Sequence, residues 1–116
     1  MTELDIHDDG AVEAWLKARR AELEQLSAGS GDQRKPVELD QASVGRLSRM
    51  DALQGQAMAK AVEQRRLDEI SRINAALRRL AEGEYGACAN CGENVSEGRL
   101  RLDPSVAVCL DCARGR

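Results

Sequence analysis

The sequence predicts a mainly α-helical protein in which two helices form an antiparallel coiled-coil hairpin and a small four-cysteine finger follows. Apolar residues recur at helical spacing along two long segments, and a stretch rich in glycine, serine and proline separates them. Hydrophobic residues make up 42% of the chain, but only 2% of residues are aromatic and much of the apolar count is alanine. Because alanine buries little area, a core of ordinary thickness is not expected.

The first helix is predicted to begin near Asp9, a possible N-cap, after a flexible and acidic N-terminus over residues 1–9. The segment AVEAWLKARRAELEQL follows with apolar residues at helical spacing, interrupted by Arg19. The stretch SAGSGD should end this helix. The apolar residues of the expected stripe are Val12, Trp15, Leu16, Leu23 and Leu26.

The second helix is predicted over residues 40–82, with Asp40 as a possible N-cap and Gly83 as the C-terminal stop. At 1.5 Å per residue it would be on the order of 60 Å long, too long for so short a chain to wrap. It should therefore project, with the first helix antiparallel along it, as a hairpin over residues 10–83 whose tip lies near 33–42. Its apolar residues are Val44, Leu47, Met50, Leu53, Met58, Ala61 and Val62, then Ile70, Ile73, Leu77 and Leu80.

Two glycines, Gly45 and Gly55, interrupt this second helix. Each weakens it by roughly 1 kcal/mol relative to alanine. They are either tolerated on an exposed face or mark close packing or a hinge near the tip.

The charge and hydropathy of the sequence argue against a nucleic-acid binder, a membrane-spanning protein and a secreted protein. Net charge is −3 and the isoelectric point is near 5.2, with both signs interleaved, whereas nucleic-acid binders normally carry a basic excess. The sequence has no apolar run of membrane-spanning length, and the N-terminus lacks the regions of a signal peptide. A cytoplasmic protein is therefore expected, and in a reducing compartment four cysteines indicate metal ligation before disulfides.

The cysteines form a C-x2-C-x17-C-x2-C array within residues 84–116, a spacing typical of structural zinc sites. Four thiolates complete the tetrahedral coordination of Zn²⁺, so we expect one structural zinc ion per chain and no open position for catalysis. Two disulfides or a thioredoxin-like pair fit such an array poorly, although oxidation of the thiolates with loss of metal stays open. The only histidine, His7, is expected to be an ordinary surface residue. The predicted ligands are Cys88, Cys91, Cys109 and Cys112.

Residues 85–112, YGACANCGENVSEGRLRLDPSVAVCLDC, resemble the zinc finger of the DksA/TraR family of bacterial transcription regulators. The shared elements are Tyr-Gly before the first cysteine, Cys-Gly, Arg-Leu, Pro104 and the four cysteines, and the resemblance covers roughly residues 36–112. It implies a zinc-stapled base that carries a two-helix coiled coil with an acidic tip. In the family, that coiled coil enters the secondary channel of RNA polymerase and alters the stability of open promoter complexes.

The resemblance also assigns residues at the tip and on the long helix. Asp40 and Ala42 match the second half of the family's Asp-x-x-Asp-x-Ala tip motif, whereas Val37 stands where the first Asp is expected. In the alternative interpretation Asp40 serves only as a helix cap, a role compatible with function. Arg65 and Arg72 fall where relatives use basic residues that face polymerase.

Some relatives act together with ppGpp through basic groups beside the finger. Here Asp103 and Ala113 occupy those two positions, so the resemblance implies a weak or absent ppGpp response. An acidic side chain repels a pyrophosphate.

The leading prediction is a monomeric, non-enzymatic regulator of RNA polymerase. One alternative is a DNA-binding zinc ribbon, which the finger's basic residues allow but the acidic balance opposes. Another is a regulator that responds to oxidation through its thiols and zinc. An enzyme is not expected, because no nucleophile–base pair, phosphate loop or open metal site is recognisable. The basic residues of the finger that allow the zinc-ribbon alternative are Arg99, Arg101, Arg114 and Arg116.

Overall fold

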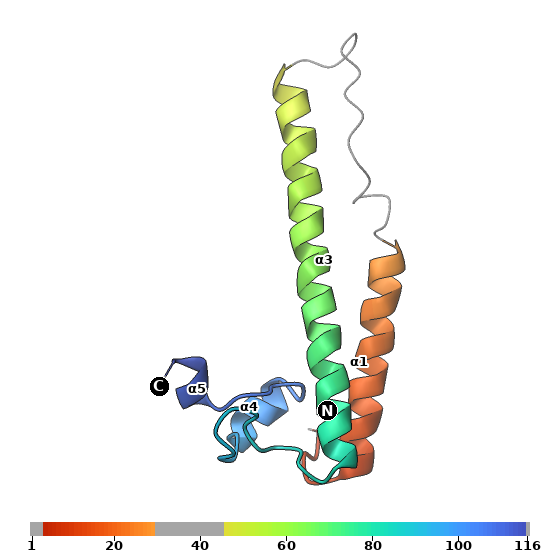
Figure 1. The fold of residues 1–116 in the computed structure, drawn as a ribbon. Coiled ribbons are helices and arrows are strands. Elements are labelled where there is room, and N and C mark those ends of the chain that lie inside the picture. The colour runs from red at the N-terminus through yellow and green to blue at the C-terminus, as the bar shows by residue number, and fades with distance from the viewer. Residues whose placement is uncertain (1–3, 30–45, 116) are drawn as a thin grey trace. The chain divides into compact units, whose positions relative to one another are not determined.

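The protein is mainly helical in a computed structural model that describes residues 4–29 and 46–115 (Figure 1). This confirms the predicted fold class, and within those ranges the structure has no strand, only an isolated antiparallel bridge between Ala87 and Asn94. The expected tip and the expected start of the second helix lie outside the described residues. The helices are α1 (Asp9–Gly29), α3 (Arg46–Ala81), α4 (Glu97–Leu102) and α5 (Leu110–Ala113).

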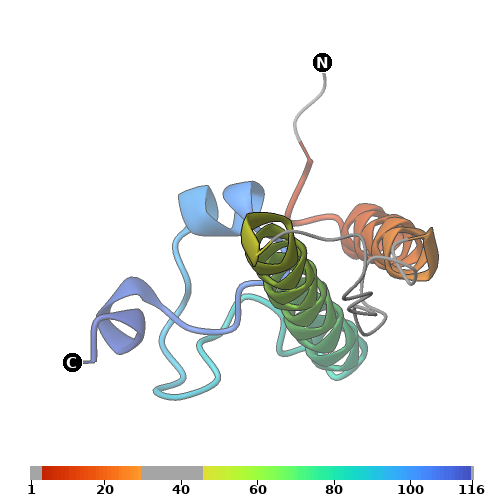
Figure 2. The same ribbon diagram turned by 90° about the horizontal axis from the view of Figure 1, so that it is seen from above.

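The chain divides into two compact units. The first comprises Met1–Ala21 and Glu69–Arg116, and the second comprises Glu22–Asp68. In the first unit, α1 and the finger helices α4 and α5 lie on different sides of the C-terminal end of α3 (Figure 1 and Figure 2). None of the helices in the described ranges combines the length and the apolar character needed to cross a membrane.

The start of α1 is capped by Asp8 rather than by Asp9. The Asp8 carboxylate accepts a hydrogen bond from the backbone N–H of Ala11 at 3.2 Å, and its carbonyl accepts from Val12 at 3.0 Å. Asp9 is the first helical residue, and its negative charge interacts favourably with the positive end of the helix dipole. At the other end α1 continues through residues 27–29, so Ser27, Ala28 and Gly29 of the expected break still belong to the helix.

The end of α3 agrees with the prediction that Gly83 stops it. Gly83 adopts φ 76°, which favours glycine. The N–H of Glu84 donates to the carbonyl of Arg79 at 2.8 Å, and the N–H of Gly83 donates to Leu80 at 3.2 Å. This pair of bonds is the Schellman arrangement, which satisfies the last carbonyls of the helix.

In the first unit, polar pairs join α1 to α3. Arg19, which interrupts the apolar stripe of α1, binds Glu69 through two parallel hydrogen bonds of 2.7 and 3.1 Å. Arg20 donates to the side-chain oxygen of Asn74 at 2.8 Å. A bidentate guanidinium–carboxylate pair holds geometry as well as charge, so Arg19 contributes to helix pairing instead of disrupting it.

In the second unit, the pairing of α1 with α3 runs antiparallel, as predicted. The hydroxyl of Ser27 donates to Glu63 at 2.5 Å, and Arg66 reaches the carbonyl of Leu26 at 3.5 Å. As the residue number rises along α1, the number of the partner on α3 falls.

The buried part of the predicted stripes is narrower than expected. Several large apolar residues of those stripes are exposed by a third or more, so the hairpin has little core of its own. A Cβ added at Gly55 would meet nothing within 4 Å, which favours the tolerated-glycine interpretation. The buried hydrophobic residues of α1 and α3 are Val12, Leu16, Leu23, Ile73 and Ala76, and the exposed ones include Trp15, Leu26, Met50, Leu53 and Met58.

Residues 4–8, the described part of the segment before α1, include one buried side chain within the stretch expected to be flexible. Ile6 is only 6% exposed and packs in the apolar cluster of the finger. The physical reason is that Ile6 removes its apolar side chain from water by packing with Val95 and Leu100 of the finger.

Candidate metal centre

The first cysteine pair is held in a tight turn closed by the bridge between Ala87 and Asn94. The N–H of Cys88 donates to the carbonyl of Glu93 at 2.7 Å, and the N–H of Gly92 donates back to Cys88 at 3.0 Å. Gly92 has φ 78°, so a glycine directly after the pair lets the chain reverse without strain. The turn therefore aims two sulfur atoms, those of Cys88 and Cys91, to one side.

The second pair lies at the start of α5. Cys109 is the N-cap residue of this short helix, and its carbonyl accepts from the N–H of Ala113 at 2.9 Å. Cys112 follows within the helix. A backbone hydrogen bond of 2.8 Å from Ala89 to Ala107 ties the two cysteine turns together.

All four cysteine sulfurs lie within 4.8 Å of one another, as the array predicts. The Sγ atoms of Cys91 and Cys109 are 3.7 Å apart. Four ligands at the usual Zn–S distance of about 2.3 Å on the corners of a tetrahedron would be separated by about 3.8 Å. The donor set and its spacing therefore fit one Zn²⁺, held by Cys88, Cys91, Cys109 and Cys112 as a closed, structural site.

The surroundings shift the pKa values of Cys88 and Cys112 in opposite directions. Hydrogen bonds from backbone N–H groups, first of Cys109 and then of Cys91, lower the pKa of the Cys88 thiol to about 6. Hydrogen bonds with the other three thiols, first with Cys109, raise the pKa of Cys112 to about 12. Several thiolates this close together repel one another, and a divalent cation would favour their ionised forms.

An apolar cluster supports the cysteines from behind. Cys88 is only 4% exposed and packs with Val95, Leu100 and Ile6. Tyr85 lies against this cluster and donates its hydroxyl proton to the carbonyl of Pro104 at 2.7 Å. These contacts fix both ends of the finger around the metal ligands.

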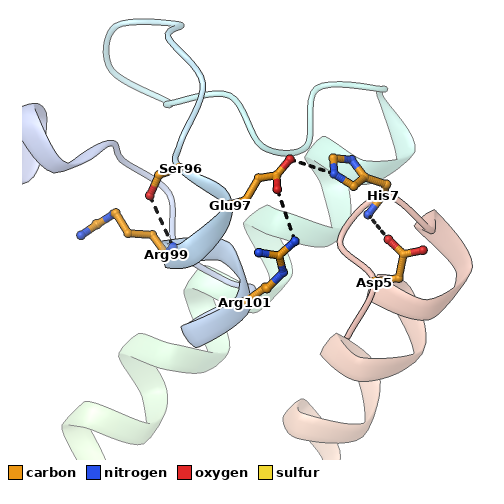
Figure 3. A network of polar contacts seen from close by, with 6 residues as sticks. All are labelled: Asp5, His7, Ser96, Glu97, Arg99 and Arg101. Carbon is orange, nitrogen blue, oxygen red and sulfur yellow. Dashed lines mark hydrogen bonds and ion pairs between the residues drawn. The ribbon is translucent and has the colours of Figure 1, made fainter. Parts of the chain in front are cut away.

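Charged side chains of α4 are engaged within the protein (Figure 3). Arg99 donates to the carbonyl of Val108 at 3.1 Å, next to the second cysteine pair. Arg101 donates to Glu97 at 3.3 Å, and the same carboxylate meets the ring of His7 at 2.9 Å. The hydroxyl of Ser96 caps α4 by accepting from the N–H of Arg99. His7 is exposed, as predicted, and its ring has a partner in Glu97.

Other predicted residues are not brought to the metal centre. Arg65 and Arg72 are exposed on α3, whereas Asp40, Ala42 and Val37 lie outside the described residues. Sequence reasoning missed the contribution of Ile6 and the cap at Asp8. An Asp three residues before Ala11 could have indicated the cap, whereas no local signal in the sequence places Ile6 against the finger.

Comparison with known proteins supports this assignment of the finger. The model of the prokaryotic dksA/traR C4-type zinc finger matches residues 83–116. Over 41 residues the chain is 42% identical to an uncharacterized protein of Aquifex aeolicus, covering 35% of this chain and 28% of that protein. Over 43 residues it is 35% identical to the RNA polymerase-binding transcription factor DksA of Haemophilus influenzae, covering 37% and 30%. The match thus spans less than a third of each of these relatives.

Two solved structures resemble the fold over nearly all of the chain. Transcription factor DksA2 from Pseudomonas aeruginosa superposes with a TM-score of 0.68 at 22% identity, covering 92% of this chain and 81% of that one. The DnaK suppressor protein from Agrobacterium tumefaciens superposes with a TM-score of 0.59 at 28% identity, covering 99% and 96%. The resemblance predicted from the sequence is confirmed: the C-terminal segment matches the dksA/traR C4-type zinc finger, and the chain has the fold of these two solved structures.

Proposed function

We propose that this chain is a non-enzymatic bacterial transcription regulator that binds RNA polymerase through the secondary channel and modulates open promoter complexes with its coiled-coil tip. The observation that carries the proposal is the 35% identity over 43 residues to the RNA polymerase-binding factor of Haemophilus influenzae. The fold shared with DksA2 supports it. In this proposal the protein acts as a cytoplasmic monomer.

The zinc centre serves this function by holding the finger together. Four sulfur ligands complete a tetrahedral site, so the metal offers no position for a water molecule or a substrate. The finger is too short to fold on apolar burial alone, and binding of the metal supplies the missing folding free energy.

The residues proposed to act on polymerase are at the tip and on α3. Asp40 and Ala42 would form the acidic tip, with Val37 in place of a first carboxylate. Arg65 and Arg72 are seven residues apart and so lie on the same side of α3, and both are exposed. Exposed charges of this kind chiefly affect the rate of association and its dependence on salt.

A response to ppGpp beside the finger is not supported by the local contacts. The carboxylate of Asp103 accepts from the N–H and the hydroxyl of Ser105, at 3.1 and 2.7 Å. These bonds hold a negative charge just before Pro104, and Ala113 has no charge with which to offset it. Because like charges repel, we propose that this site binds the alarmone weakly or not at all.

The test is transcription in vitro from a stringent promoter, with and without ppGpp, together with binding to polymerase in the absence of DNA. Asp40→Asn should still bind polymerase but alter transcription less than the wild type, whereas the matched control Asp51→Asn should behave as wild type. Arg65→Ala with Arg72→Ala should weaken binding by about two- to fivefold, more at low salt than at high salt. Arg78→Ala removes an exposed arginine from another side of α3 and should have a smaller effect.

The outcomes separate the candidate functions. Absence of binding between the wild-type protein and polymerase would contradict the proposal. Identical transcription with wild type and Asp40→Asn would remove the tip from it. Binding to DNA without polymerase would instead favour a zinc-ribbon module, which the internal contacts of Arg99 and Arg101 make less favourable.

A further inference from the structure

The turn at residues 5–8, here called the N-terminal strap, is an ordered element attached to the finger (Figure 3). The N–H of His7 donates to the Asp5 carboxylate at 2.9 Å, and the N–H of Asp8 donates to the Asp5 carbonyl at 3.1 Å. Asp8 in turn caps α1 through the N–H of Ala11. The strap is therefore held in shape by its own bonds and connects directly to the first helix.

Ile6 of the strap lies against the apolar side of the metal centre. Its side chain is 6% exposed and belongs to a cluster with Cys88, Val95 and Leu100. The ligands Cys109 and Cys112 pack partly against the same cluster. A residue near the N-terminus thus covers the buried ligand Cys88, whereas Cys91 is exposed and lines an open pocket with Cys109 and Cys112.

The polar attachments of the strap are weak in comparison. The ring of His7 meets Glu97 at 2.9 Å, but the two side chains are 70% and 55% exposed. Water screens exposed pairs of this kind, so they contribute little to stability. A pocket of about 220 Å³ also borders the strap, lined in part by Ile6, His7, Gly86 and Asn94. The attachment of the strap to the finger therefore depends chiefly on the buried side chain of Ile6. The strap can detach without unfolding of the helices.

We propose that the N-terminal strap is a movable cover for the zinc centre, and that its detachment sets the rate at which the metal is lost. When Ile6 leaves the cluster, the buried ligand Cys88 loses part of its packing and becomes accessible to water and competing ligands, as the exposed Cys91 already is. A chelator donor can then bind the zinc ion as a cysteine sulfur leaves it. This inference rests on the zinc site and is independent of the binding of polymerase.

The test measures transfer of zinc from the metal-loaded full chain to a chromogenic chelator. Ile6→Ser should release zinc about tenfold faster than wild type, because a buried isoleucine contributes most of the attachment. It should still hold one zinc ion per chain before the chelator is added. The control Leu26→Ser removes an apolar side chain that is 45% exposed in the other unit, and its release rate should equal that of wild type.

Hydrogen exchange distinguishes detachment of the strap from general destabilisation. In Ile6→Ser the amide of Val95, bonded to Gly86 at 2.8 Å, should exchange faster, while the amide of Ile73 in α3 should not change. Equal acceleration at both amides, or a release rate within twofold of wild type, would overturn the proposal.

Two further outcomes are also decisive. If Ile6→Ser does not retain zinc during purification, Ile6→Val replaces it and should release zinc a few-fold faster, and no change in that variant would overturn the proposal. If the wild-type chain itself holds no zinc, both the zinc site and the strap's role fail. If zinc is present and release does not depend on Ile6, only the strap's role fails.

Discussion

Tyr85 shows how one side chain ties the two ends of the finger together. Its hydroxyl donates to the carbonyl of Pro104 at 2.7 Å, and its ring packs against the cluster behind Cys88. Burial raises the pKa of Tyr85 to about 12, the positive charge of Arg79 opposes this rise, and the negative charge of Asp103 adds to it. The tyrosine of the Tyr-Gly motif thus has a structural role, and its hydrogen bond to Pro104 requires the protonated hydroxyl.

This pKa predicts a loss of stability at high pH. The pKa is 10.0 in the absence of the fold and about 12 in the folded protein, so the folded state binds the proton more tightly. The stabilising effect is complete below pH 10 and is lost as pH rises from there through about 12. Because Tyr85 is the only tyrosine, the ultraviolet absorbance of its phenolate measures the titration directly.

The control for this prediction is Tyr85→Phe, which lacks both the hydroxyl and its titration. It should be less stable at neutral pH by about 1 kcal/mol, the usual contribution of one hydrogen bond. Its stability should also fall less than that of wild type between pH 10 and 12. A phenolate midpoint near pH 10 in the folded protein would contradict the assigned burial.

At the scale of the elements, the pairing of α1 with α3 combines a narrow apolar stripe with polar contacts at the same surface. Arg19 and Glu63 both stand where a purely hydrophobic hairpin would place apolar residues. Glu63 is 5% exposed, accepts from the hydroxyl of Ser27, and lies 4.0 Å from Arg66. Buried polar contacts of this type restrict which registers of the two helices are acceptable, although they contribute less to stability than apolar packing does.

Glu63 therefore predicts opposite effects for two kinds of substitution. Ser27→Ala removes a donor from a buried carboxylate and should lower the free energy of unfolding by about 1–3 kcal/mol. Ser27→Ala combined with Glu63→Met replaces the polar contact with an apolar one and should restore stability to the wild-type value or above. Chemical denaturation measures both changes, and Gln64→Met, on the exposed side of α3, is the control. A double variant less stable than Ser27→Ala would contradict this account.

For the whole molecule, the features that sequence predicts well are those controlled by local chemistry. The spacing of four cysteines identifies the metal centre, and Gly83 marks the end of α3 because a positive φ favours glycine there. The contacts that sequence does not predict join distant segments. Nothing local to Arg19 indicates that Glu69 will pair with it, and nothing local to Ile6 indicates that the finger needs a cover.

Removal of zinc should separate the order of the finger from that of the helices. The finger has only 6 and 4 helical residues in α4 and α5, whereas α1 and α3 have 21 and 36. The buried residues Val12, Leu16 and Ile73 of α1 and α3 lie outside the cluster that surrounds Cys88. We therefore expect a chelator to leave most of the helical circular dichroism signal unchanged while the amide of Cys88 loses its protection from hydrogen exchange. Return of zinc should restore that protection. If the helical signal collapsed together with the finger, the metal would be stabilising the whole chain, and the division between a zinc-dependent finger and independently paired helices would be wrong.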